Sequence, residues 1–220
     1  MKGLLLTMTE VRPEHEEEFN AWYDDEHLAE RLAIPGFVSA QRWTAGGRCD
    51  LAAAPARRVG RYLATYELER PEVLDTPEYR RHVGDGFTPW SKRSLGRALV
   101  FRRWACAQIN PGDALPPAGA RGLFLACGDV PAEHEAEFNR WYDAEHVPML
   151  RQVEGVLAAR RFRAREGTPR YIALYDLADA GIPESPGWRA AIATPWSRRI
   201  DELTADCEWI LKAYARYTPA

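Results

Sequence analysis

Short segments in which hydrophobic residues alternate with polar ones, or recur at helical spacing, run along the first half of the chain. Apolar and aromatic alternation predicts strands, at residues 4–11, 37–43, 62–68 and 99–109. Apolar positions three or four apart predict a long helix at 13–33 and a shorter one at 71–83. Pro13 suits the start of the first helix and Gly36 its end. The predicted order is β-α-β-β-α-β, the ferredoxin-like motif.

The second half of the chain repeats the first. Residues 19–27 (F-N-A-W-Y-D-D-E-H) recur at 138–146 (F-N-R-W-Y-D-A-E-H), at an offset of 119 residues. Two later blocks recur at offsets of 109 and 106, which requires deletions in the second copy. The pattern again predicts four strands, at 122–130, 156–163, 171–177 and 208–217. It also predicts helices at 132–152 and 188–193, and a further helical turn at 196–203. The chain is therefore a tandem duplication.

Prolines and glycines separate the two copies at residues 110–119, where neither a helix interior nor a central strand is expected. We predict a first ferredoxin-like unit at 1–109, a linker at 110–120 and a second unit at 121–220. The first unit also carries a longer loop, at 45–58. Both helices of each unit should cover one face of its four-stranded sheet. We therefore expect the bare faces to pack together as an intrachain α+β barrel.

The duplicated motif F-N-x-W-Y-D-x-E-H, followed by Pro35-Gly36 and a later Tyr-rich strand, resembles proteins of the dimeric α+β barrel superfamily, and among them the EthD-like group. The resemblance spans both copies and implies a pseudo-dimeric barrel. That superfamily includes cofactor-free oxygenases, lactone isomerases, polyketide cyclases, decarboxylases, dehydratases, haem enzymes and proteins without known activity. The second copy departs from the motif at Glu154, and the first has Ala29 where the second has Pro148.

Composition narrows the choice of partners and compartment. With 46% hydrophobic residues, 28% charged residues and a net charge of −3, the chain has an ordinary globular composition. Its arginine clusters are short, which disfavours nucleic acid and membrane surfaces as partners. The four cysteines are widely spaced without a C-x-x-C pair, so we expect no zinc site, no disulfide framework and a cytoplasmic location. The apolar run at 4–6 is too short for a signal peptide, and no segment has the length of a membrane helix.

Two histidines that end the repeated motif, His27 and His146, are the first candidates for chemistry. A neutral imidazole near a carboxylate is the commonest general acid or base at physiological pH. Asp24 and Asp143 lie three residues earlier and could orient the rings. The alternative is structural, with the imidazole capping a loop carbonyl or bonding to Tyr66.

Two glutamates, Glu26 and Glu145, fall on the predicted apolar stripe of the first helix in each copy. At a rotation of 100° per residue, Ala33 also falls on this stripe in the first copy. A buried carboxylate must be paired or have its pKa raised. These side chains could act as general bases. The alternative is a salt bridge to Arg42 or Arg161 on the next strand.

Aromatic side chains at helical and strand spacing usually form core. This fold can also trap a space between sheet and helices, and aromatic walls with a few hydroxyls suit a flat or cyclic organic molecule. The candidate substrate-binding residues are Trp22, Tyr23, Tyr66 and Trp90 in the first copy and Trp141, Tyr142, Tyr175 and Trp196 in the second.

No motif in the sequence indicates a metal or cofactor. There is no H-x-x-x-H pair, no Gly-rich phosphate loop and no nucleophile elbow around a serine. His82 has no counterpart in the second copy and could be a solvated side chain or a haem or metal ligand.

We therefore expect a cofactor-independent enzyme that acts by acid–base chemistry on a small aromatic, polyketide-like or lactone substrate, by isomerisation, cyclisation, dehydration or decarboxylation. Its partner would be a small molecule, and two chains could form a homodimer. The alternatives are a non-catalytic small-molecule binding protein and a haem-dependent enzyme of the same fold.

Overall fold

Eight antiparallel strands form a closed barrel in the computed structural model, which describes residues 1–46 and 58–219. The order around the barrel is β1-β3-β2-β8-β5-β7-β6-β4. The strands are β1 (Gly3–Val11), β2 (Phe37–Thr44), β3 (Tyr62–Leu68), β4 (Ala98–Asn110), β5 (Gly122–Gly128), β6 (Val156–Glu166), β7 (Tyr171–Leu177) and β8 (Trp209–Arg216). The predicted α+β barrel of two ferredoxin-like repeats is confirmed. Most of the predicted loop at 45–58 lies outside the described residues.

Two joints between the repeats close the barrel. Strands β4 and β6 pair through five residue pairs, from Ala105 with Glu166 to Asn110 with Arg161. Strands β2 and β8 pair through only two, Trp43 with Arg216 and Thr44 with Ala215. Each repeat therefore contributes four consecutive strands, and the repeats meet edge to edge as well as face to face.

Side chains fill the interior of the barrel. Alternate residues of β1, namely Leu4, Leu6 and Met8, point inward and pack in one core with Trp104 and Phe162. The residue between them, Leu5, belongs instead to the core under the helices of the first repeat. Because side chains alternate along a strand, one face of each sheet packs in the core inside the barrel and the other face packs in the core under the helices of its repeat.

A buried ion cluster crosses the barrel. Arg160 of β6 donates to Glu67 of β3, with Nη1 2.7 Å from Oε1, and to Asp176 of β7, with Nε 3.0 Å from Oδ2. All three side chains are at most 2% exposed. In the sequence alignment of the repeats, Glu67 corresponds to Asp176, whereas Arg160 corresponds to the neutral Gln41. One guanidinium therefore serves two equivalent carboxylates.

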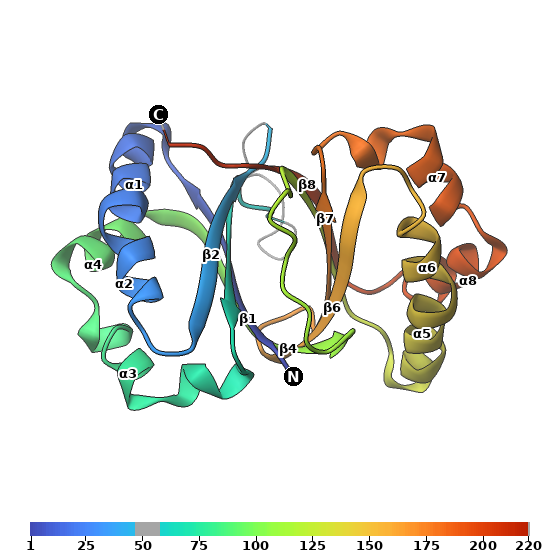
Figure 1. The fold of residues 1–220 in the computed structure, drawn as a ribbon, viewed down its shortest axis with the longest axis horizontal. Coiled ribbons are helices and arrows are strands. Elements are labelled where there is room, and N and C mark those ends of the chain that lie inside the picture. Colours follow the sequence, from blue (N-terminus) through green and yellow to red (C-terminus); the bar gives the residue numbers. More distant parts are fainter. Residues whose placement is uncertain (47–57, 220) are drawn as a thin grey trace.

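Helices cover the two outer sides of the barrel (Figure 1). In the first repeat these are 3-10 turns at Pro13–His15, Pro71–Asp75 and Gly84–Gly86, a π-helical turn at Tyr23–His27, and α1 (Glu16–Trp22), α2 (Leu28–Leu32), α3 (Pro77–Arg80) and α4 (Pro89–Gly96). In the second they are 3-10 turns at Ala132–His134 and Ile182–Glu184, a π-helical turn at Tyr142–His146, and α5 (Glu135–Trp141), α6 (Val147–Leu150), α7 (Pro186–Ile192) and α8 (Pro195–Leu203).

The helical segment after β3 differs from the prediction. Residues 71–83 form short turns rather than one helix, and α4 follows them where no helix was predicted. Its equivalent α8 was predicted as a helical turn. Both helices begin at a threonine, Thr88 or Thr194, whose hydroxyl accepts a hydrogen bond from the backbone N–H of Ser91 or Ser197. The T-P-x-S sequence is a capping signal for both helices.

The long helix predicted at 13–33 is interrupted by the π-helical turn. The backbone N–H of Leu28 donates to the carbonyl of Tyr23, five residues earlier. A π-helical turn stacks side chains five apart, so the rings of Trp22 and His27 lie 4.3 Å apart between centroids. Beyond this turn the buried face shifts. Ala33, predicted on the buried stripe, is exposed, and Arg31 is buried instead.

Candidate active site

The first repeat holds a cavity of about 270 Å³ between the outer face of its sheet and its helices. Trp22, Tyr23 and His27 of the π-helical region line it from one side and Tyr66 of β3 from another. The predicted histidine and three predicted aromatic residues are therefore brought together. The cavity lies on the helix side of the sheet and not inside the barrel.

The second repeat holds the equivalent cavity, with a volume of about 400 Å³. Trp141, Tyr142, His146 and Tyr175 line it, each at the position that matches a residue of the first cavity. The two predicted tryptophans Trp90 and Trp196 line neither cavity. They pack at the margin of the helix-side cores instead.

The imidazoles have nearly identical surroundings in the two repeats. The His146 ring stacks on Trp141 at 4.1 Å between centroids, which matches the stack in the first repeat. The rings of Tyr66 and Tyr175 are roughly perpendicular to the imidazoles of His27 and His146, with 6.2 Å between ring centroids in each repeat. Among the described residues, Nδ1 of each histidine and the hydroxyl of each of these tyrosines are buried without a hydrogen-bond partner. The residues that line each cavity therefore include polar groups with unused hydrogen-bonding capacity.

Burial decides the charge state of these groups. It lowers the pKa of His27 well below the usual 6.5, and that of His146 to about 3, with further lowering by nearby arginines. It raises the pKa of Tyr66 and Tyr175 well above 10.0. At neutral pH each cavity therefore presents an uncharged imidazole and a protonated phenol.

Asp24 and Asp143 do not orient the histidines, which corrects the sequence prediction. Asp24 binds Arg42 of β2, with Oδ1 2.9 Å from Nη1, and Asp143 binds Arg161 of β6 at 3.0 Å. The same guanidinium groups also donate to an asparagine of the first helix in each repeat. These aspartates therefore tie the first helix of each repeat to its neighbouring strand.

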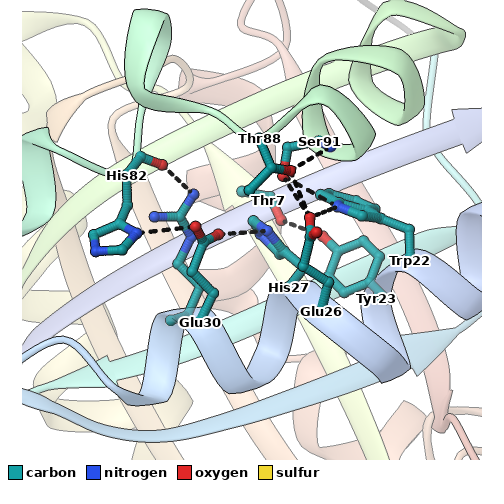
Figure 2. A network of polar contacts seen from close by, with 10 residues as sticks. Thr7, Trp22, Tyr23, Glu26, His27, Glu30, His82, Thr88 and Ser91 are labelled. Atoms are coloured by element: carbon teal, nitrogen blue, oxygen red, sulfur yellow. Dashed lines mark hydrogen bonds and ion pairs between the residues drawn. The ribbon is translucent and has the colours of Figure 1, made fainter.

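A different carboxylate approaches His27. Figure 2 shows Glu30 between His27 and His82. Its Oε2 lies 3.9 Å from Nδ1 of His27, which is too long for a hydrogen bond, while its Oε1 lies 2.9 Å from Nδ1 of His82. His82 is thus bound to a carboxylate rather than simply solvated. Met149 stands at the position of Glu30 in the second repeat.

Glu26 and Glu145 form hydrogen bonds rather than the predicted salt bridges to Arg42 and Arg161. Glu26 accepts from the hydroxyl of Thr88 at 2.6 Å and from the indole N–H of Trp22 at 3.2 Å (Figure 2). Glu145 accepts from the hydroxyl of Thr194 at 2.5 Å. Each glutamate therefore links the first helix of its repeat to the capped start of α4 or α8, and the indole that stacks on His27 is held by one of these bonds.

Charged residues of the cavities were missed by the sequence analysis. Arg31 and Arg103 line the first cavity, and Asp201 lines the second. Arg31 was missed because the predicted stripe of the first helix assumed no π-helical turn; Arg103 lies on β4 and Asp201 on α8, where the sequence analysis considered no cavity residues. A comparison of the two repeats would have marked position 31, where Leu150 is the counterpart of Arg31.

Within residues 1–46 and 58–219, no group of three or more His, Cys, Asp or Glu side chains is placed to hold a metal ion. The cysteines of this part of the chain, Cys106, Cys127 and Cys207, are free thiols. In the same residues, no helix combines the length and the apolar character that crossing a bilayer requires.

Solved structures share the whole architecture. An anthrone oxidase-like protein superposes with a TM-score of 0.61 at 13% identity, covering 99% of this chain and 91% of its own. A "putative monooxygenase" from Lactobacillus acidophilus NCFM gives 0.58 at 10% identity, covering 99% and 94%. A chlorite dismutase mutant from Candidatus Nitrospira defluvii, in complex with cyanide, gives 0.54 at 8% identity, covering 99% and 91%. No protein-family model and no curated sequence matches the chain.

These likenesses establish the fold. The chain has the architecture of the dimeric α+β barrel proteins, here formed by two repeats of one polypeptide. The narrower resemblance to the EthD-like group depends on the duplicated F-N-x-W-Y-D-x-E-H motif.

Proposed function

We propose that the protein is a cofactor-independent enzyme for a small aromatic or polyketide-like carbonyl compound, and that the helix-side cavities are its active sites. One observation carries this proposal. In each repeat, a histidine and a tyrosine that line one aromatic cavity have a ring nitrogen and a hydroxyl buried without hydrogen-bond partners among the described residues.

The chemistry follows from the charge states. An uncharged imidazole and a protonated phenol can both donate hydrogen bonds to a carbonyl oxygen and stabilise the enolate that forms when the substrate loses a proton. The negative charge of the enolate would raise the pKa of the nearby imidazole, because an adjacent anion favours its protonated form. The unprotonated ring nitrogen of His27 or His146 would accept the proton from the substrate carbon and later return it, while the hydroxyl of Tyr66 or Tyr175 donates a hydrogen bond to the oxygen.

An enolate is the common intermediate of several reactions. Reprotonation at another carbon gives isomerisation, attack on a second carbonyl gives cyclisation, and loss of carbon dioxide or water generates or consumes the same species. Reaction with dioxygen gives oxygenation, the kind of activity that the names of the anthrone oxidase-like and monooxygenase relatives indicate for those proteins. The free thiols Cys106 and Cys127, both buried, agree with the proposed cytoplasmic location.

Proton transfer can be tested before the substrate is known. The assay is deuterium incorporation from heavy water into an aromatic ketone with an enolisable C–H bond, such as anthrone or 1-indanone, followed by NMR. We expect exchange to be catalysed, and to fall about 100-fold or more when both His27 and His146 are replaced by alanine. His134→Ala, which removes a histidine that lines neither cavity, is the matched control and should keep full exchange.

Three results would contradict the proposal. Unchanged exchange in the folded double histidine variant would remove the imidazoles from the mechanism. Binding of ketones without any catalysed exchange would indicate the non-catalytic binding protein. A Soret band in the purified protein would indicate the haem-dependent alternative.

A further inference from the structure

The first cavity contains a buried cation without a counter-ion. Arg31 is 3% exposed and lines the cavity, and no carboxylate lies within 4.0 Å of its guanidinium among the described residues. Its Nη2 donates to the backbone carbonyl of His82 at 2.8 Å, while Nη1 is buried without a partner. A charge in this state is costly unless something pairs with it.

The other charged groups near Arg31 do not pair with it. Glu30 binds His82 through Oε1, and its Oε2 is buried without a hydrogen-bond partner among the described residues, but neither oxygen lies within 4.0 Å of the Arg31 guanidinium and Glu30 does not line the cavity. Arg103 lines the cavity and is paired with Glu166, with Nη1 2.5 Å from Oε2, and its Nη2 donates to the hydroxyl of Tyr79 at 3.3 Å. No aspartate or glutamate appears among the described residues of the cavity wall. The cavity is therefore electropositive without an internal anion to balance Arg31.

The fold does not require this arrangement. Leu150 occupies the position of Arg31 in the second repeat and is fully buried there. Leu211 takes the position of Arg103, because each residue pairs with the equivalent residue of the first strand of its repeat, Thr7 or Ala126. Leu211 lines the second cavity, whereas Leu150 packs in the core of the second repeat. A leucine can thus stand at either position in this fold, so a buried arginine without a counter-ion at position 31 points to a ligand.

We propose that the first cavity binds a small organic anion, a carboxylate attached to a flat apolar body, and that Arg31 pairs with the carboxylate. Planar guanidinium groups suit carboxylates because they can donate two parallel hydrogen bonds. The rings of Tyr79 and Phe87, whose centroids lie 5.6 and 5.8 Å from the Arg31 guanidinium carbon, provide the apolar wall beside it. The second repeat has leucines at both arginine positions and Asp201 in its cavity wall, so among the described residues its cavity offers no cation to the carboxylate. This proposal and the proposed function have in common only that the ligand binds in the first helix-side cavity.

The test compares benzoate with benzamide, which has the same shape without the charge, by isothermal titration calorimetry on the full chain. We expect one benzoate site per chain, with benzoate bound at least about tenfold more tightly than benzamide. Arg31→Leu, which installs the residue of the second repeat, should weaken benzoate binding about tenfold or more and leave benzamide binding nearly unchanged. Arg31→Lys should retain part of the preference.

The matched control is Arg151→Leu, which makes the same change in net charge at an exposed position outside both cavities. It should leave benzoate binding unchanged. The proposal is overturned if neither compound binds, if benzamide binds as tightly as benzoate, or if Arg31→Leu keeps the preference. If Arg31→Leu does not fold, the same loss is required of Arg31→Gln. Benzoate binding is measured without turnover. A failed deuterium exchange assay would therefore not contradict benzoate binding, and a failed binding experiment would not contradict the exchange.

Discussion

The two helix-side cavities share one plan and differ in charge. Each has an imidazole stacked on an indole by a π-helical turn, with a tyrosine at its edge. Around this common part, Leu211 of the second cavity replaces Arg103 of the first, and Asp201 replaces Leu95. Arg31 is replaced by Leu150, which packs in the core of the second repeat. The common part can be inherited from the ancestor of both repeats. The differing positions show what the architecture leaves free, and the proposed difference in ligand preference depends on them.

The barrel interior shows the opposite relation, because Arg160, a charge present in only one repeat, bonds to carboxylates of both. Arg160 bonds to a carboxylate of each repeat, whereas the side chain of its counterpart Gln41 donates only to the neighbouring backbone carbonyl of Arg42, as far as the described part of the chain shows. A residue that differs between the repeats can therefore contact a single cavity, as Arg31 does, or join both repeats, as Arg160 does. Substitutions at equivalent positions separate the two cases.

The largest expected effect on stability is at this ion cluster. Arg160→Gln gives the second repeat the residue of the first and leaves Glu67 and Asp176 buried without a cation. Burial already raises the pKa of both carboxyl groups. We expect the free energy of unfolding to fall by about 3–5 kcal/mol, as for other buried pairs that lose one partner. Urea denaturation measures it. Gln41→Ala, the control, should cost less than about 1 kcal/mol, and similar costs at both sites would contradict the asymmetry.

The next effect is a loss of stability in acid that both histidines share. The imidazole of the unfolded chain titrates near pH 6.5 and that of folded His146 near 3. The unfolded state therefore binds more protons below pH 6.5, and stability is full above that pH and falls as the pH drops toward 3. Between pH 7 and pH 5 the loss is at most about 2 kcal/mol for His146.

His146→Phe should remove that part of the pH dependence, measured by urea denaturation at the two pH values. His27→Phe should act in the same direction, because burial lowers the pKa of His27 as well. A pH dependence that is unchanged in both variants would show that the imidazoles are not buried in the neutral form.

The smallest expected effect compares the two threonine caps. Thr88→Val and Thr194→Val each remove a cap and a hydrogen bond to a glutamate. Glu26 keeps its bond from Trp22, whereas within the described residues Glu145 keeps none. We expect a loss of about 1 kcal/mol for Thr88→Val and nearer 2 kcal/mol for Thr194→Val. Thermal unfolding of the two variants checks the order, and a larger loss for Thr88→Val would contradict it.

The sequence predicted the fold well because the pattern of each strand lies within a short segment and occurs in both repeats. The strands follow from alternation, and each repeat supported the assignment of the other. The closing of the barrel followed from the need to cover two bare sheet faces. The helix α4 was missed although the T-P-W-S cap was present in both copies, because its few apolar residues give a weak periodicity.

The candidate site was predicted in its residues more than in its contacts. His27, Trp22 and Tyr66 do meet in one cavity, but the partners of the acidic residues were wrong. The helical wheel put Glu26 near the arginine of the next strand, and in the structure Asp24 binds that arginine. A single π-helical turn changes which side chains face the sheet, and the sequence pattern gave no sign of it. Arg31 was overlooked for the same reason.

The covalent connection between the repeats has a genetic consequence. In a symmetric pair of identical chains, one codon sets the same position in both cavities, so neither can change alone. Here positions 31 and 150 are encoded separately, and a mutation can change the charge of one repeat and leave the other as it was. A single gene product can thus carry two unlike ligand sites in a fixed one-to-one ratio.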